Sequence, residues 1–271
     1  MTRRRRGMFF TLSMLLLGSA LLSFIFFLSE QSTKSSDTVT YLMEVDRASD
    51  KYSEVEDGMA RIISPYINIS VQNGTVRIVE SLPLSANIAD DLGRFALFEA
   101  NYSGMNVSMN TTQIAGGNFI IQPSGTAVAN SAGEFEVVPQ DSAQGAGTLN
   151  SYDVEIVFQP GAIDDAAWLA VSNSSADTMN VHVRVRDASY AVVRDFYSAL
   201  DKHGSSSLNV TSAGATVAIV GFSSPAALLV QCSGNIGLKA SISFSNPAYV
   251  ETGDTINVEY AANRTGRARI A

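Results

Sequence analysis

The stretch Asn180-Val-His-Val-Arg-Val-Arg186 alternates apolar and polar residues without interruption. Successive side chains of a β-strand point to opposite faces, so the three valines share one face and His182, Arg184 and Arg186 share the other. Such a strand belongs to a sheet that covers a core on one side only. The stretch therefore predicts a half-buried strand with an exposed polar face; the alternative is that a sulfate, a sugar or an acidic partner binds there.

The same kind of pattern recurs along the rest of the chain. Tyr152–Phe158 and Thr255–Tyr260 also alternate, and richer apolar runs are typical of central strands at Ala215–Phe222, Ala226–Val230 and Leu238–Phe244. Turn-forming glycine, proline and asparagine residues separate these segments. Short strands at such spacing predict an antiparallel β-sandwich.

One internal stretch has the composition of a boundary. Residues Gln140–Thr148 are rich in Gly, Ser and Gln. We therefore expect a proximal β region with one short helix (residues 65–148) and a C-terminal β-sandwich (residues 149–271). A single sandwich with a long hairpin is the alternative.

Two helices are expected before and within this β body. The first is an amphipathic stalk over residues 29–64, ended by Pro65. The second covers Ala86–Ala100 and places Leu92, Phe95 and Phe98 on one side. The apolar seam of the stalk has the 3-4 spacing of a coiled coil and packs either on the β body or on neighbouring subunits; its members are Val45, Ala48, Tyr52, Val55, Met59 and Ile62.

The N-terminus differs from this body. Arg3–Arg6 and Gly7 precede an uncharged run from Met8 to Leu28, MFFTLSMLLLGSALLSFIFFL. About 20 apolar residues cross a bilayer as a helix, and flanking arginines stay on the cytoplasmic side. We therefore expect a basic cytoplasmic leader (residues 1–7), a single transmembrane helix (residues 8–28) and a body outside the cell. The expected fold class is α+β: a transmembrane and stalk α-helix followed by a mainly β, antiparallel sandwich head.

The composition argues against several classes of function. Without residues 1–7, the chain keeps 14 basic residues against 26 acidic ones, a net charge of −12 that disfavours nucleic acid as a partner. The lone cysteine, Cys232, rules out an intrachain disulfide and favours a prokaryotic envelope. His182 and His203 are the two histidines, too few for a usual His/Cys metal site, and no serine lies in a G-x-S-x-G elbow. We therefore expect no catalytic residue, no metal and no cofactor, and an anchored hydrolase is disfavoured.

Potential N-glycosylation sites are numerous. An N-x-S/T sequon indicates a surface position in a secreted protein. Eight occur, and all are candidate glycosylation sites: Asn68, Asn73, Asn101, Asn106, Asn110, Asn173, Asn209 and Asn263.

Basic residues, a glycine, an uninterrupted apolar segment, an amphipathic stalk and a β-rich head together resemble type IV pilin-like proteins. The archaeal form has Arg-Gly before a segment such as Phe9-Phe-Thr-Leu12. The resemblance implies that a prepilin peptidase cuts between Gly7 and Met8. Many pilins carry an acidic residue five positions after the cut, whereas this chain has Leu12 there.

Small residues of the apolar segment provide candidate packing positions. Gly18, Ser19 and Ser23 would let helices approach closely. The first hypothesis is a structural or adhesive pilin-like surface subunit, which is membrane-anchored, assembles through its N-terminal helix and displays the sandwich outside the cell. Its partners would be membrane lipid, copies of itself or other pilin-like subunits, and the peptidase. The alternative is a tethered envelope adhesin or interaction module that does not polymerise.

The resemblance yields a prediction about processing. We expect the mature chain to begin at Met8, because the cut that the resemblance implies follows Gly7. Intact-mass analysis and N-terminal peptide mapping of native protein measure this directly. Peptides that retain the Arg6-Gly7-Met8 junction as the dominant species would contradict the pilin-like interpretation.

Overall fold

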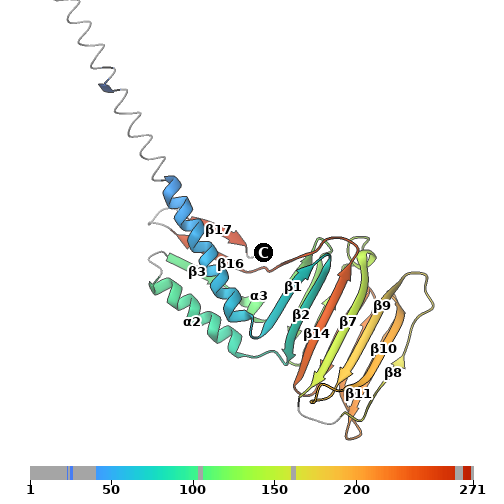
Figure 1. Ribbon diagram of the computed structural model, residues 1–271. Coiled ribbons are helices and arrows are strands. Elements are labelled where there is room, and N and C mark those ends of the chain that lie inside the picture. Colours follow the sequence, from blue (N-terminus) through green and yellow to red (C-terminus); the bar gives the residue numbers. More distant parts are fainter. Residues whose placement is uncertain are drawn as a thin grey trace, which may run out of the picture. The chain divides into compact units, whose positions relative to one another are not determined.

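The computed structural model describes residues 23, 25–26, 41–102, 106–159, 163–259 and 265–269. The chain divides into two units, Met1–Lys51 and Tyr52–Ala271. In the first unit, the described residues, 23, 25–26 and 41–51, are helical. All β-strands of the described residues belong to the second unit (Figure 1).

The expected transmembrane topology needs correction. Over the described residues, no helix combines the length and the apolar character needed to cross a bilayer. The prediction of a single-pass membrane protein, and with it a fold class that begins with a transmembrane helix, is therefore wrong for the part of the chain that the structure describes. Of the run Met8–Leu28, only Ser23, Ile25 and Phe26 belong to that part. The β-rich head agrees with the prediction.

Two large sheets form most of the second unit. The six-stranded sheet has the order β1 (Ile67–Gln72), β2 (Thr75–Leu82), β14 (Ile236–Phe244), β7 (Leu149–Phe158), β9 (Thr178–Arg186), β10 (Val192–Asp201). The eight-stranded sheet has the order β15 (Tyr249–Glu251), β4 (Phe119–Gln122), β5 (Thr126–Ser131), β6 (Glu134–Val138), β13 (Ala227–Cys232), β12 (Ala215–Ser223), β11 (Ser206–Ser212), β8 (Asp165–Ala170). In both sheets the strand pairs are antiparallel, except that β7 and β9 run parallel.

The two sheets belong to one sandwich. Strands from before and after Gln140–Thr148 share both of them: β2 pairs with β14, β6 with β13, and β4 with β15. A short 3-10 helix, Ala146–Thr148, lies within that stretch. The architecture therefore corresponds to the single-sandwich alternative, since the Gly-rich stretch connects strands without separating two β bodies.

The inner faces of the sheets enclose the core. β14 shows the pattern most clearly, because every second residue from Ile236 to Phe244 is buried. Aromatic side chains connect the sheets: the Tyr152 hydroxyl on β7 donates to the Ala226 carbonyl at 2.8 Å, and its ring centroid lies 6.0 Å from that of Phe222 on β12. Burial of each large apolar side chain contributes about 1.5–3 kcal/mol.

A smaller layer joins the sandwich within the second unit. It contains a three-stranded sheet in the order β17 (Thr265–Arg269), β16 (Thr255–Glu259), β3 (Asn106–Asn110), together with helix α2 (Asn87–Tyr102), the short helix α3 (Thr112–Ala115) and the helical residues 52–63 (Figure 1). Ile256 and Val258 of β16 are buried, as are Ile88 and Leu92 of α2.

The helical residues 52–63 pack on the protein's own body. Val55, Met59 and Ile63 are buried at i, i+4 spacing. Ile62, the last member of the predicted seam, is only partly buried, so Ile63 takes its place on the packed side of the helix. Gly58 allows close contact with α2, because a Cβ there would overlap the ring of Phe95. The expected position of α2 agrees with the structure, although Phe98 is exposed and not on the packed side.

One buried carboxylate ties the smaller layer to the loop between β15 and β16. Asp254 is fully buried, and its two oxygens accept the backbone N–H groups of Gln113 (2.9 Å) and Ile114 (2.7 Å) in α3. Those amides lack partners within so short a helix, and a carboxylate satisfies them strongly.

A second buried carboxyl lies between the two sheets. Glu80 on β2 points inward and accepts a hydrogen bond from the Asn130 amide of β5 at 3.2 Å. Burial, partly offset by that hydrogen bond, raises the pKa of Glu80 to about 7. An unfolded glutamate loses its proton near pH 4.5. The folded state therefore binds the proton more tightly, and this contribution to stability is lost as pH rises from about 4.5 to 7.

We expect Glu80→Gln to remove this pH dependence, because the amide stays neutral. The free energy of unfolding of the variant, relative to wild type, should increase by about 3 kcal/mol between pH 4 and pH 8. Urea unfolding at a series of pH values measures the difference. Glu136→Gln, at an exposed glutamate of β6, is the matched control. A difference between wild type and Glu80→Gln that does not vary with pH would refute the assignment.

Candidate functional site

The outward face of the six-stranded sheet carries two rows of polar residues. Strand register places Asp153 of β7 beside His182 of β9, and His182 beside Tyr197 of β10. The next row contains Lys239 of β14, Glu155 of β7, Arg184 of β9 and Asp195 of β10. We call the residues of these two rows, together with Arg186 and with Tyr190 of the turn between β9 and β10, the polar face.

His182 is enclosed within this face. Its side chain is only 12% exposed, because its ring stacks on the ring of Tyr197 with centroids 4.0 Å apart and an interplanar angle of 11°. Nε2 lies 2.6 Å from an Asp195 oxygen, and Nδ1 lies 3.4 Å from an Asp153 oxygen. The two carboxylates fix the orientation of the imidazole, which lies beside the Tyr197 ring and stacks on one face of it.

The Glu155 carboxylate forms ion pairs with two guanidinium groups. Nη1 of Arg184 donates to its Oε2 at 3.1 Å. Nε of Arg186 lies 3.1 Å from the same oxygen, in an ion pair whose geometry does not give a hydrogen bond. Burial of Glu155 favours the neutral acid, but the two guanidinium groups and the Lys239 ammonium outweigh it, so the pKa of the carboxyl is lowered.

The turn between β9 and β10 presents an exposed tyrosine. Tyr190 has a φ of 64° and is 64% exposed. A carboxylate oxygen of Asp187 accepts the backbone N–H groups of Ser189 (2.8 Å) and Ala191 (3.0 Å), and Arg186 donates to the Tyr190 carbonyl at 2.8 Å. Residues other than glycine seldom adopt a positive φ. Those that do are concentrated at functional sites.

A groove of about 300 Å³ opens beside this turn. Tyr66 and Asn68 line it at the β1 side, Tyr190 at the turn, and Glu155, Gln159 and Lys239 between them. Gly237 of β14 also lines it, where the absent side chain leaves space opposite Val157. The groove thus combines aromatic rings with groups that donate and accept hydrogen bonds, as ligand sites do.

The sequence predicted one strand of this face and missed its neighbours. His182, Arg184 and Arg186 do share the outward face of β9, and carboxylates of β7 and β10 lie against them. Tyr190 and Tyr197 were not predicted as functional residues. Alternation in Tyr152–Phe158 did place Asp153 and Glu155 on an outward face, but it does not reveal that β7 lies beside β9.

The predicted sequons lie mostly at the surface. Asn68, Asn73, Asn101, Asn110 and Asn173 are exposed. Asn209 on β11 is partly buried, and its Oδ1 is buried without a hydrogen-bond partner among the described residues. Asn106 lies on β3, but its side chain is outside the described part of the chain, as is all of Asn263.

The other predicted site residues belong to the N-terminus. The processing residues Gly7 and Met8 and the packing residues Gly18 and Ser19 lie outside the described residues, while Ser23 is helical and exposed. In the described ranges, no group of three or more His, Cys, Asp or Glu side chains is placed to hold a metal ion.

We expect Glu155→Gln to lower the free energy of unfolding by about 1 kcal/mol at pH 7, because Arg184 and Arg186 lose their shared carboxylate. Since the folded-state pKa of Glu155 is lowered, its stabilising contribution is present above the usual carboxyl pKa and is lost as pH falls. The difference from wild type should therefore shrink toward pH 3. Urea unfolding at both pH values measures it.

Asp153→Asn is the matched control, because that carboxylate is about half exposed and makes a single longer contact, with His182. Its expected cost is a few tenths of a kcal/mol. Equal losses for the two variants would show that the Glu155 ion pairs do not stabilise the face.

Comparison of the chain with protein-family models, with curated proteins and with solved structures finds no match. The resemblance to type IV pilin-like proteins therefore stays a prediction from the N-terminal residues.

Proposed function

We propose that this chain is a pilin-like structural subunit with an adhesive sandwich, and that it assembles with copies of itself through its N-terminal segment. Exposed apolar side chains on the helical residues 41–51 are the observation that carries the proposal. Leu42, Met43 and Val45 are 55%, 58% and 45% exposed. Association that covers such side chains gains about 1.5–3 kcal/mol for each one fully buried.

The predicted seam supports assembly at this end of the chain. Its later members, Val55 and Met59, are buried within the second unit. Val45, its first member, is exposed, and Ala48 is partly exposed. A copy of the same segment has the complementary apolar surface, as in a coiled coil. The uncharged run Met8–Leu28 precedes this segment and would extend the contact between copies.

The outward surface of the sandwich supports an adhesive role. The polar face displays Tyr190 and Tyr197, both largely exposed, above fixed ion pairs. Exposed tyrosines are enriched where proteins bind other molecules, because one ring offers both apolar area and a hydroxyl group. Assembly would array this face repeatedly, so weak individual contacts would add to avidity.

We expect Val45→Glu to weaken self-association of the full chain at least tenfold, because one charge would enter an apolar contact. Sedimentation velocity in a mild detergent, needed for the uncharged run, measures the association. Val45→Leu should associate like wild type, since it keeps the apolar surface.

Ser174→Glu adds the same charge at an exposed loop position and should also associate normally. Circular dichroism verifies that all variants keep the wild-type fold. If wild type sediments as a monomer at all concentrations, the chain is a non-polymerising interaction module and the assembly proposal fails.

A further inference from the structure

We infer that the polar face, with the groove beside Tyr190, is a binding site for a neutral pyranose oligosaccharide. This inference rests on the adhesive part of the proposed function and is independent of assembly. The ligand class follows from three features of the face: two exposed tyrosine rings, a row of partly exposed hydrogen-bonding groups between them, and the mutual neutralisation of the charges.

The rings provide flat apolar contacts. Tyr197 is 72% exposed. The imidazole of His182 stacks on one face of its ring, so the opposite face of the ring is open to solvent. Tyr190 is held at the far end of the same strand pair by the Asp187 turn. His182 and Arg186, which mark the two ends, are four residues apart on β9, or about 13 Å. The faces of pyranose rings carry C–H groups, which pack on the negative face of an aromatic ring.

The groups between the rings match the hydroxyls of a sugar. The carboxylates of Asp153 and Asp195 are 55% and 39% exposed, and their remaining lone pairs can accept from hydroxyl groups. The guanidinium groups of Arg184 and Arg186 are about one-quarter exposed and have further N–H groups that can donate to hydroxyl oxygens. Ion pairs already fix these side chains, so binding costs little side-chain entropy.

The charge balance favours a neutral ligand over an anionic one. Each guanidinium of the face already faces a carboxylate, and Lys239 lies beside Glu155 in register. A sulfate or a carboxylate would have to displace Glu155 or Asp195 and leave a negative charge without its partner. A polyol, by contrast, can add hydrogen bonds to the ion pairs without breaking them.

The test is binding of defined trisaccharides to the full chain. Maltotriose, cellotriose, mannotriose and tri-N-acetylchitotriose are the neutral probes, and a sulfated disaccharide is the anionic probe. The detergent must lack a sugar headgroup. Protein without glycan by intact mass is used, because Asn68 lines the groove and belongs to a sequon. Isothermal titration and saturation-transfer NMR report binding of each probe.

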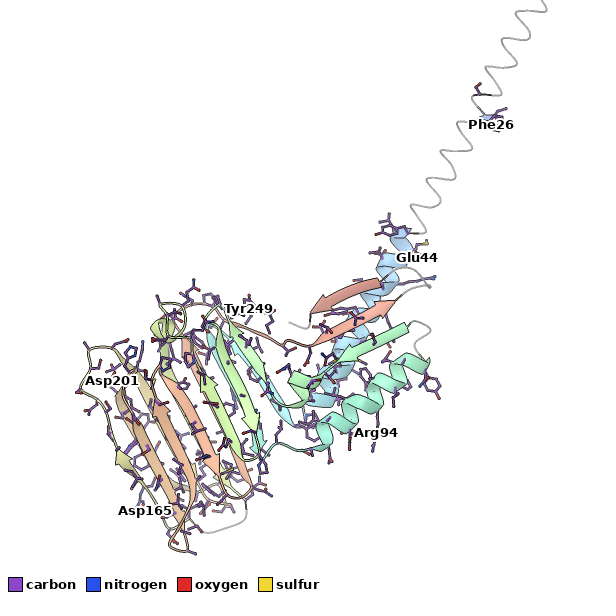
Figure 2. The ribbon with its side chains drawn as sticks, turned by 180° about the vertical axis from the view of Figure 1, so that it is seen from behind. Phe26, Glu44, Arg94, Asp165, Asp201 and Tyr249 are labelled. Atoms are coloured by element: carbon purple, nitrogen blue, oxygen red, sulfur yellow. The ribbon has the colours of Figure 1, made fainter. Side chains whose placement is uncertain are left out.

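At least one neutral trisaccharide should bind, and Tyr197→Ala should weaken it about tenfold, the size of one lost aromatic contact. Tyr190→Asn should weaken it similarly, since asparagine keeps the left-handed turn and removes only the ring. Tyr249→Ala is the matched control, because Tyr249 is similarly exposed but lies on β15 of the other sheet (Figure 2). Its affinity should equal that of wild type.

Two results would overturn the inference: no neutral probe binds, whether or not the sulfated probe does, or Tyr249→Ala loses binding as strongly as Tyr197→Ala. Sedimentation velocity on the same samples separates this failure from failure of the proposed function. Assembly without saccharide binding would reject the ligand and retain the subunit, whereas saccharide binding by a monomer would do the reverse.

Discussion

The buried, mainly apolar interface between the six-stranded and eight-stranded sheets is the constraint on which the rest of the structure depends. Every second residue of β14 must be apolar, because its side chain enters that interface and cannot reach water. Tyr152 shows how strict this is: its ring is buried, and its hydroxyl still finds the Ala226 carbonyl. Burial on this scale offsets the conformational entropy of ordering long strands with few helices.

Two buried carboxyl groups differ in the partners that surround them. Asp254 accepts hydrogen bonds from two backbone N–H groups of α3, donors that the short helix leaves open. Glu80 receives one amide hydrogen bond, and the interior instead favours its protonated form. The two carboxyl groups thus differ in the donors around them: α3 provides two for Asp254, and β5 provides one for Glu80.

The polar face is the necessary counterpart of the buried one. Once alternate residues of β7, β9 and β10 enter the core, the residues between them must point outward and lie in rows across the sheet. Parallel pairing of β7 with β9 then brings Asp153 beside His182 and Glu155 beside Arg184. Like charges on one strand lie beside opposite charges on the neighbouring strands. The resulting ion pairs hold the surface that carries the two exposed tyrosines.

The sequence by itself determined the local structure: the strand alternation of residues 180–186, the helix that became α2 and the outward position of His182, Arg184 and Arg186. These follow from period and composition, which act over a few residues. Tertiary structure alone decided the strand order, the single sandwich across Gln140–Thr148, the ion pairs of Glu155 and the burial of Glu80. Partners of a strand come from distant parts of the chain, and no local pattern encodes them.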